Sequence, residues 1–95
     1  MKLELIYEKN RIYAENESHQ VIAEVTFPDM DEQTVNIDHT FVDDSLRGQG
    51  VAGKLMEASA SLLREQKRKA VLTCSYAVKW FDSHPEYCDI RTNKS

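Results

Sequence analysis

All three glycines of the chain lie within the seven residues RGQGVAG at 47–53. Glycine reaches positive φ without steric cost and lets a ligand approach the backbone closely. The stretch lies where an amphipathic helix is predicted to begin, and the first N–H groups of a helix have no partner inside it. The positive end of the helix dipole adds to these donors, and together they favour an anion such as a pyrophosphate. The predicted chemistry is phosphate binding by backbone amides.

Two familiar phosphate-binding patterns match the stretch only in part. The P-loop pattern G-x-x-x-x-G-K-[ST] is met at Gly48, Gly53 and Lys54. It fails at Leu55, which stands where the hydroxyl group that binds magnesium is required. The dinucleotide pattern G-x-G-x-x-G is met formally at Gly48, Gly50 and Gly53. However, the antiparallel sheet predicted before it and the short chain do not fit a doubly wound fold.

The residues before the glycine stretch must form strands, because they alternate between apolar and polar with period 2. In the last predicted strand, Val35 and Ile37 lie on one side. His39 and Phe41 continue that side. The run is interrupted by turn residues, so it predicts an antiparallel meander. The predicted strands cover residues 3–7, 11–15, 20–27 and 34–42.

After the glycine stretch the apolar spacing becomes that of a helix. Val51, Leu55, Ala58 and Leu62 recur at spacings of four, three and four, which predicts an amphipathic helix. A crossover through such a helix makes the strands on either side of it parallel and the connection right-handed. Pro85 ends the last helix, because the residue before a proline disfavours helix. The predicted elements are a helix at 50–66, a strand at 70–76 and a short helix at 77–84.

Composition limits the class of protein. With 95 residues, 41% hydrophobic and 29% charged, the chain is expected to be one globular domain over residues 1–95. A net charge of −4 argues against a nucleic-acid partner, because such binding depends on cationic contacts to phosphate. No apolar run approaches the roughly 20 residues of a membrane span, and no signal peptide is evident, so a cytoplasmic protein is expected. Cys74 and Cys88 form neither a metal-ligand pattern nor a disulfide framework, so no metal is expected.

The stretch at 47–52 resembles the signature [R/Q]-x-x-G-x-[G/A] of the GNAT superfamily, the acetyl-CoA-dependent N-acyltransferases. Arg47, Gly50 and Ala52 stand on its defining positions. The resemblance covers about residues 34–76, where strand, signature, helix and strand follow in the family's order. Ile37-Asp38-His39-Thr40, Cys74 and His84-Pro85-Glu86-Tyr87 are also similar to a compact bacterial subgroup that consists of little more than the minimal domain.

The resemblance implies a binding mode for acetyl-CoA. The loop amides hold the coenzyme's pyrophosphate, and the preceding strand pairs through its backbone with the pantetheine. Lys54 or Arg64 is a candidate contact for the 3′-phosphate. We expect Gly53, which the signature does not explain, to allow a close contact between helix and strand. The implied cofactor-binding residues are Phe41, Val42, Arg47, Gly48, Gln49, Gly50, Val51, Ala52, Gly53 and Lys54.

Three residues are candidates for catalysis. Transfer to an amine needs a base, because a lysine-like amine with a pKa of about 10.4 is mostly protonated at neutral pH. The resemblance places such a carboxylate at Asp38, and strand alternation lets only one of Asp38 and His39 face the cleft. Cys74, near the C-terminal end of the predicted strand, offers a second route in which its thiolate accepts the acetyl group and passes it on. The ordinary alternatives are a solvated Asp38, a sheet-surface His39 and a buried Cys74.

Other parts of the family's machinery are missing from the sequence. Larger members place a tyrosine acid on the helix after the second strand, where this chain has Trp80 and Phe81, which we expect to pack in the core. Larger members also insert two helices between the first strands. His84, as a base for Cys74, is predicted to lie roughly 10 Å away along the helix.

The sequence therefore predicts a minimal GNAT-like α+β fold. It has an antiparallel meander, a parallel strand-helix-strand unit and a short C-terminal helix. The predicted function is acetyl transfer from acetyl-CoA, as co-substrate, to an amine on an unknown small molecule or protein. Neither nucleic acid nor membrane is expected as a partner, and a dimer could supply the missing wall of the acceptor site. The alternatives are a coenzyme-A-binding module without turnover, and a nucleotide-phosphate binder that ATP or NAD would stabilise as well as coenzyme A.

Overall fold

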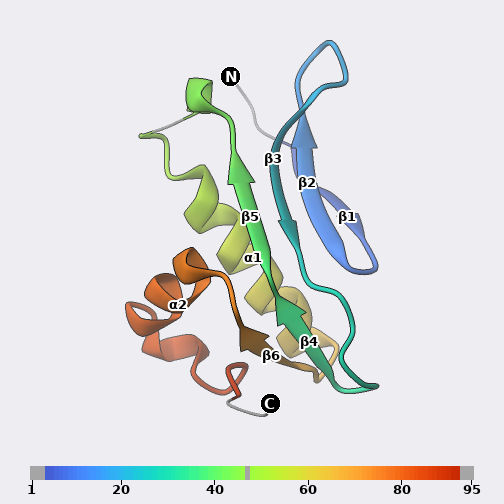
Figure 1. Ribbon diagram of the computed structural model, residues 1–95, viewed down its shortest axis with the longest axis vertical. Helices are drawn as coiled ribbons and strands as arrows, with labels where there is room; N and C mark the ends of the chain where they lie inside the picture. The colour runs from blue at the N-terminus through green and yellow to red at the C-terminus, as the bar shows by residue number, and fades with distance from the viewer. Residues whose placement is uncertain (1–3, 47, 93–95) are drawn as a thin grey trace.

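The computed structural model describes residues 4–46 and 48–92 of the chain. Arg47 lies outside the described residues, so its predicted cofactor contact is not tested by the structure. The elements follow the predicted order of meander, helix, strand and helix (Figure 1). The α+β fold class is confirmed.

Four strands form an antiparallel sheet in the order β1-β2-β3-β5. Their inward residues, among them Ile12, Ala14, Ala23 and Val25, are fully buried, as the period-2 pattern requires. The helix α1 packs on this inner face against β2, β3 and β5, and it passes behind β5 in Figure 1. The strands are β1 (Ile6–Glu8), β2 (Arg11–Glu15), β3 (Val21–Thr26) and β5 (His39–Val42).

A second, two-stranded sheet pairs β4 (Thr34–Ile37) with β6 (Lys69–Leu72) in parallel. This confirms the parallel join predicted across the helix α1 (Val51–Glu65). The prediction of one continuous strand over 34–42 is wrong, because the chain breaks at Asp38 and β4 and β5 belong to different sheets. Beyond the break β5 pairs with β3 alone, so the two sheets diverge (Figure 1).

The predicted strand at 70–76 ends early, at Leu72. The backbone N–H groups of Thr73 and Cys74 both donate to the carbonyl oxygen of Ile37, each at 3.2 Å, and this turns the chain out of the ladder. The helix α2 (Ser75–Asp82) therefore begins two residues before the predicted 77–84. Cys74 is its N-cap and not a strand residue.

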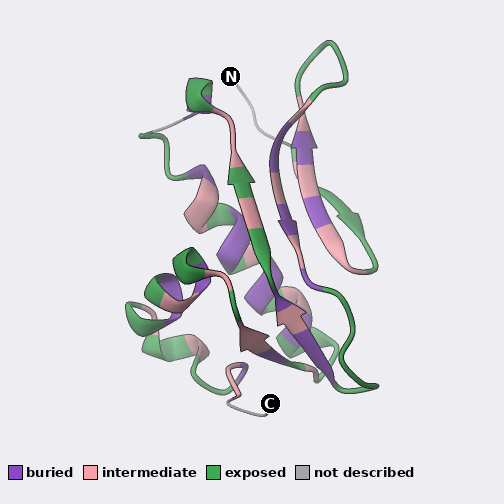
Figure 2. Cartoon of the chain, viewed as in Figure 1, coloured by how far each residue is buried: buried purple, intermediate pink, exposed green. Residues whose placement is uncertain are grey.

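The buried residues form one core between the inner sheet face and the two helices. Figure 2 shows this burial as purple stretches on β2, β3, α1 and α2. Trp80 and Phe81 are 7% and 4% exposed, so both are core residues, as expected. Two short 3-10 turns, Asp44–Leu46 and Pro85–Tyr87, complete the described chain.

Candidate functional site

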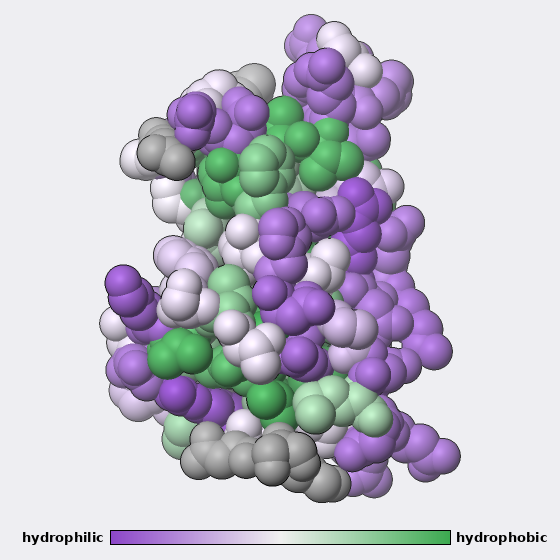
Figure 3. Space-filling model, viewed as in Figure 1, coloured by the Kyte–Doolittle hydropathy of each residue, from purple (hydrophilic) through white to green (hydrophobic). Residues whose placement is uncertain are grey.

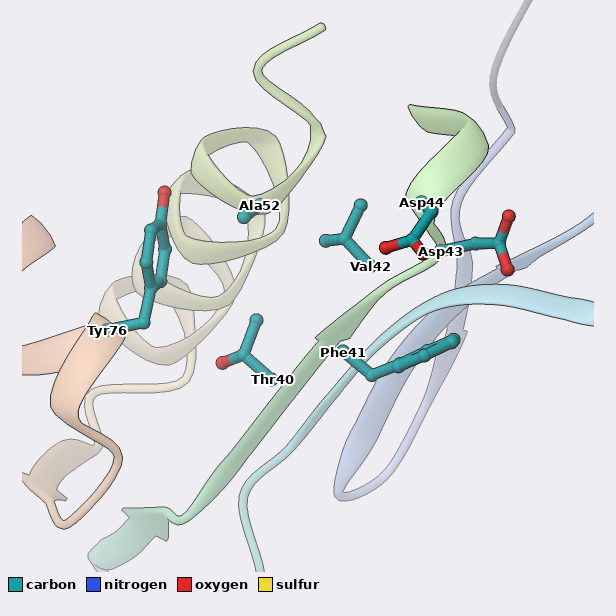
Figure 4. A pocket seen from close by; sticks show the side chains of 7 residues that line it. All are labelled: Thr40, Phe41, Val42, Asp43, Asp44, Ala52 and Tyr76. Carbon is teal, nitrogen blue, oxygen red and sulfur yellow. The ribbon is translucent and has the colours of Figure 1, made fainter. Parts of the chain in front are cut away.

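The space between β5, the start of α1 and the start of α2 contains two neighbouring cavities of about 480 Å³ and 230 Å³. Val42, Ala52 and Tyr76 line both of them, so one residue comes from each of the three elements. Figure 4 shows Thr40 and Val42 pointing from β5 toward Ala52 and Tyr76. The larger cavity follows β5, and the smaller one reaches the glycine stretch.

The first turn of α1 leaves its backbone donors open. The first bond inside the helix runs from the N–H of Lys54 to the carbonyl oxygen of Gly50, at 3.1 Å. The N–H groups of Val51, Ala52 and Gly53 precede that bond and have no partner within the helix. Gly50 is the N-cap and has no side chain to cap them. The amides predicted to form the cradle thus lie at this helix start and take no part in the helix's own hydrogen bonds.

Positive φ explains two of the glycines. Gly48 has φ +83° and Gly50 has φ +71°, a region that costs other residues roughly 1–2 kcal/mol. A Cβ atom built at either position would meet no atom within 4 Å, so these positions need glycine for conformation and not for space inside the protein. The side that a ligand would approach is open.

The predicted contact of Gly53 with a strand is wrong, because its neighbours belong to a helix. A Cβ atom there would lie 3.6 Å from Nε1 of Trp80 and 3.9 Å from the hydroxyl oxygen of Tyr76. Both side chains belong to α2, so the contact joins two helices and not helix and strand. These are ordinary van der Waals distances. The α2 helix therefore approaches the first turn of α1 through side chains, without a close backbone contact.

The segment between β5 and α1 is held by its own hydrogen bonds. Asp43 accepts hydrogen bonds from the backbone N–H of Ser45 at 3.0 Å and from its hydroxyl at 2.6 Å. These bonds lower the pKa of Asp43 below the usual 3.8. Leu46 is buried, and its carbonyl oxygen accepts the N–H of Gln49 at 3.2 Å. These bonds give residues 43–46 a defined turn just before the glycine stretch.

One edge of β5 is open. This strand is the last in the sheet order, and the N–H of Asp43 donates to the carbonyl oxygen of Ile22 in β3 at 2.7 Å. Backbone groups of successive strand residues point in opposite directions. The N–H and C=O groups of Thr40 and Val42 therefore point to the open edge, toward α2. The side chain of Phe41, by contrast, points away from Ala52 and Tyr76 (Figure 4).

Tyr76 is a site residue that the sequence analysis missed. It lies in the first turn of α2, lines both cavities, and is 38% exposed. Partial burial raises its pKa above 10.0, so its hydroxyl stays protonated at neutral pH and can donate a hydrogen bond. The helical spacing of Ala77, Trp80 and Phe81 was the available signal, because it puts Tyr76 on a different face from these core residues.

Cys74 lies beside Thr40, a residue of β5 that lines the larger cavity. Its Sγ atom is 3.6 Å from Oγ1 of Thr40, a contact that crosses the gap between the two sheets. Thr40 is a cavity-lining residue, so the thiol lies on the inner side of β5. The sulfur is half-buried and sits beside the N-terminal end of α2. Among the three catalytic candidates, Cys74 contacts a residue of the cavity.

Asp38 and His39 lie on the opposite, outer side of the sheet. The hydroxyl of Thr26 donates to Oδ1 of Asp38 at 2.7 Å, and Nε2 of His39 is 3.8 Å from Oε1 of Glu24. Glu24 and Thr26 alternate with the buried Val25, so they face outward. The predicted alternation of Asp38 and His39 is wrong, because the strand break at Asp38 puts both side chains on one face.

The remaining candidates lie apart from this centre. Nδ1 of His84 is 2.7 Å from the carbonyl oxygen of Trp80, and its ring stacks on the indole at 3.9 Å, so α2 separates it from Cys74. Gln49 and Lys54 are exposed near the helix start. Arg64 lies at the other end of α1 and binds Asp89, with 2.5 Å between Nη2 and Oδ1, so it is not a contact for a phosphate at the cradle.

Among residues 4–46 and 48–92, no group of three or more histidine, cysteine, aspartate or glutamate residues is arranged to hold a metal ion. Neither helix in the same residues has the length and apolar character that a membrane span requires.

The order and arrangement of the elements are those of a known family. The family model described as GCN5-related N-acetyl-transferase matches residues 11–90. The chain is 40% identical over 53 residues to protein NATD1 of Xenopus tropicalis, which is 56% of this chain and 49% of that protein. For NATD1 of Homo sapiens the identity is 39% over 51 residues, which is 54% of this chain and 45% of that protein. The chain thus spans about half the length of these curated relatives.

Solved structures agree with the family match. The solution NMR structure of a GCN5-like protein from Staphylococcus aureus superposes with a TM-score of 0.80 and 33% identity, covering 98% of this chain and 91% of that one. The crystal structure of the GNAT family N-acetyltransferase YhbS of Escherichia coli in complex with CoA gives a TM-score of 0.61 and 28% identity, covering 73% of this chain and 42% of that one. The chain belongs to the GCN5-related N-acetyltransferase family.

Proposed function

We propose that this chain binds acetyl-CoA between β5 and the N-terminal ends of α1 and α2, and transfers the acetyl group to an amine. One observation carries the proposal. The backbone amides of Val51, Ala52 and Gly53, which have no partner within α1, open onto a cavity that continues along the edge of β5 facing away from β3. A phosphate at the amides and an extended chain along the strand would satisfy both sets of backbone groups at once.

The phosphate end of this ligand supplies most of the expected affinity. Hydrogen bonds to a charged group contribute about 1.5–3 kcal/mol each, and the helix dipole adds about 0.3–1 kcal/mol. Gly48 and Gly50 leave the approach to the amides free. The Tyr76 hydroxyl, next to Gly53, adds a neutral donor from α2. Gln49 and Lys54 are exposed near the helix start. We propose that they contact the outer oxygens and that Arg47 adds positive charge.

The pantetheine end would lie along β5. Thr40 and Val42 present backbone donors and acceptors there, as a neighbouring strand would require. Their side chains and Tyr76 form the walls of the cavity. This direction takes the thioester away from the glycine stretch and toward the contact between Thr40 and Cys74.

Cys74 is the residue we propose to react with the thioester. The Cys74 sulfur attacks the acetyl carbonyl carbon, the bond between that carbon and the coenzyme sulfur breaks, and the thiol proton leaves with the coenzyme as CoA–SH. An amine then attacks the acetyl-cysteine carbonyl, the carbon–sulfur bond breaks, and the amine proton restores the Cys74 thiol. Each step exchanges one acyl bond for another and needs no other reactant.

Asp38 is the proposed base for the amine. Its carboxylate lies on the outer face, across the strand break from Cys74, and can take a proton from an ammonium group there. His39 lies near Glu24. We propose that His39 helps to stabilise the charge at Asp38 during the proton transfer. Direct attack of the amine on acetyl-CoA, with Asp38 as the base, is the second form of the reaction.

Isothermal titration calorimetry tests the binding step. We expect heat with acetyl-CoA and with CoA, and at least tenfold weaker binding of ATP and NAD, because neither of these has a chain to pair with β5. Equal affinity for ATP would favour the nucleotide-phosphate alternative. No heat with acetyl-CoA would remove the proposal.

Intact-mass spectrometry after incubation with acetyl-CoA tests the transfer step. Cys88 is an exposed thiol in the same chain, so Cys88→Ala is the matched control for Cys74→Ala. We expect one acetyl group on the wild type and on Cys88→Ala, and none on Cys74→Ala. Thiol release with an amine but no adduct would select direct transfer.

A binding module without turnover is the second candidate function. The observation that favours it is that two of the three catalytic candidates, Asp38 and His39, lie on the outer side of the sheet and not in the cavities. Acetyl-CoA binding without CoA–SH release for any amine would select this function.

A further inference from the structure

The outer face of the four-stranded sheet carries a row of side chains that the proposed function does not use. Strand register aligns Ile6 with Tyr13, Tyr13 with Glu24, and Glu24 with Phe41. Strands lie about 4.8 Å apart, so the row extends roughly 14 Å across the sheet. Ile6 is 37% exposed and Phe41 is 39% exposed. The row therefore has an accessible apolar side chain at each end, and between them the guanidinium of Arg11 lies over the Tyr13 ring and pairs with Glu24.

A second, polar row lies beside the first. It runs from Glu8 through Arg11 and Thr26 to His39, and Asp38 is attached to it by the hydrogen bond from Thr26. Figure 3 shows this face of the molecule, with hydrophobic surface next to hydrophilic surface. The inner face of the same sheet is covered by α1, so the outer face is the one open to a partner.

The charges on this face are predominantly negative. The two rows carry one guanidinium group, that of Arg11, and three carboxylates, which belong to Glu8, Glu24 and Asp38. Arg11 donates hydrogen bonds to Glu24 and Glu8, which raises its pKa above the ordinary value of an arginine and leaves its guanidinium engaged. Within the described part of the chain, no lysine or arginine forms an ion pair with Asp38. A cationic group on the partner would complement that carboxylate.

Asp38 also marks the place where the two sheets diverge. The preceding carbonyl, that of Ile37, accepts the N–H groups of Thr73 and Cys74, and beyond Asp38 the strand β5 leaves β4 and β6. The contact between Cys74 and Thr40 lies on the inner side of the same gap. An amine bound beside Asp38 would thus approach the gap from the side opposite to the proposed coenzyme.

We propose that this outer face docks the acetyl acceptor, and that the acceptor is a polypeptide segment whose lysine ammonium pairs with Asp38 while neighbouring apolar side chains cover the row from Ile6 to Phe41. A small amine would contact one or two of these side chains, whereas a polypeptide can span all four strands. Arginine could pair with Asp38 as well, but its guanidinium is not a usable nucleophile because it stays protonated. The inference rests on the proposed transfer of acetyl groups to amines.

Two synthetic peptides and one small amine test the proposal. The first peptide alternates leucine and lysine and is blocked at its N-terminus; the second has glutamate in place of lysine; the small amine is n-butylamine. Fluorescence anisotropy of the labelled peptides measures docking without acetyl-CoA, and peptide mass measures acetylation with it. We expect the lysine peptide to bind and to be acetylated at least tenfold faster than n-butylamine, and the glutamate peptide not to bind.

Surface variants locate the docking. We expect Asp38→Asn to weaken binding of the lysine peptide about two- to fivefold, as for an exposed ion pair, and less so at high salt. Ile6→Ser should weaken it about fivefold through lost apolar contact. Met30→Ser is the matched control, because Met30 is 47% exposed but lies in the loop after β3, away from the two rows. Acetyl-CoA affinity should be the same in Ile6→Ser, Met30→Ser and the wild type.

The outcomes separate this proposal from the one on which it rests. Peptide binding that Ile6→Ser and Asp38→Asn leave unchanged would overturn the docking surface, and so would equal acetylation rates for n-butylamine and the peptide. Normal peptide docking without any acetyl-CoA binding would support the surface and reject the proposed function.

Discussion

The two ends of α1 are built in opposite ways. At the C-terminal end, the N–H groups of Gln66, Lys67 and Arg68 donate to the carbonyl oxygens of Leu62, Arg64 and Leu63 at 2.8–3.1 Å. At the N-terminal end, Gly50 supplies no cap and three amides precede the first bond within the helix. The C-terminal end is thus closed by the chain's own hydrogen bonds, whereas the first three amides at the N-terminal end take no part in the bonds within the helix.

Side chains reinforce the same difference. Arg64 binds Asp89, Lys69 donates to the carbonyl oxygen of Asp89 at 2.7 Å, and Arg68 binds Asp29, which also contacts the β1–β2 turn through Asn10. These contacts tie the C-terminal end of α1 to three other segments. The glycine end is held mainly through the hydrogen bonds of Asp43 and the buried Leu46. The side-chain contacts are concentrated at one end of the helix, and the proposed ligand site lies at the other.

Gly50→Glu is the substitution that we expect to have the largest effect, and it acts at the glycine end of α1. A glutamate would add strain at φ +71° and put a carboxylate where we propose that the pyrophosphate binds. We expect at least tenfold weaker acetyl-CoA binding by calorimetry. Gly50→Asn is the control, because asparagine tolerates positive φ without adding charge. If Gly50→Glu bound acetyl-CoA like the wild type, the open helix end would have no part in binding.

Acid should weaken the closed end. Hydrogen bonds from Arg68 and Asn10 lower the pKa of Asp29 below 3.8, and those from Arg64 lower that of Asp89. A carboxyl group whose pKa is lowered by folding stabilises the folded state above its unfolded pKa and loses that contribution as the pH falls through its folded value. We expect Tm to be nearly constant from pH 7 to 5 and to drop below pH 4.

Asp89→Asn and Asp29→Asn should each flatten that decline, as measured by circular dichroism melts from pH 7 to 2. An unchanged decline in both variants would mean that other carboxylates dominate acid unfolding.

Tyr76→Phe tests the donor that α2 lends to the open end. The hydroxyl lies next to Gly53 and lines both cavities, so its removal takes away one neutral hydrogen bond. We expect acetyl-CoA affinity to fall about two- to tenfold, with Tm of the free protein unchanged. A wild-type affinity in Tyr76→Phe would make Tyr76 a wall of the cavity only.

Lys67→Gly should give the smallest effect and one of opposite sign. Lys67 adopts φ +59° at the end of α1, where glycine avoids the steric cost of a side chain. We expect a gain of about 0.5–1 kcal/mol in the free energy of unfolding, from urea titration, and no change in acetyl-CoA affinity. A loss of stability would show that contacts of the Lys67 side chain outweigh the backbone strain.

The sequence predicted the glycine end well, because its signal is local. Positive-φ residues and the start of a 3.6-residue period lie next to one another there, and no distant contact is needed to interpret them. The break at Asp38 has no such signal. The apolar alternation continues from Val35 through Phe41, and the break appears only where β5 pairs with β3 while β4 pairs with β6.

Residues placed by that break were predicted poorly for the same reason. Asp38 and His39 share the outer face because the chain changes sheets between β4 and β5. Cys74 became a helix cap because its N–H and that of Thr73 both donate to the carbonyl oxygen of Ile37, which is distant in sequence. Tyr76 was missed because α2 begins earlier than the spacing of Trp80 and Phe81 indicates.

Because the two sheets diverge, β5 has no neighbouring strand on the edge that faces away from β3. Between the open edge of β5 and the start of α2, a chain that pairs with Thr40 and Val42 would act as a structural element as well as a ligand. Its binding free energy would add to that of folding, as RT ln(1 + [L]/Kd) for ligand concentration [L]. The melting temperature of this protein in a cell would then follow the local supply of the molecule that completes its sheet.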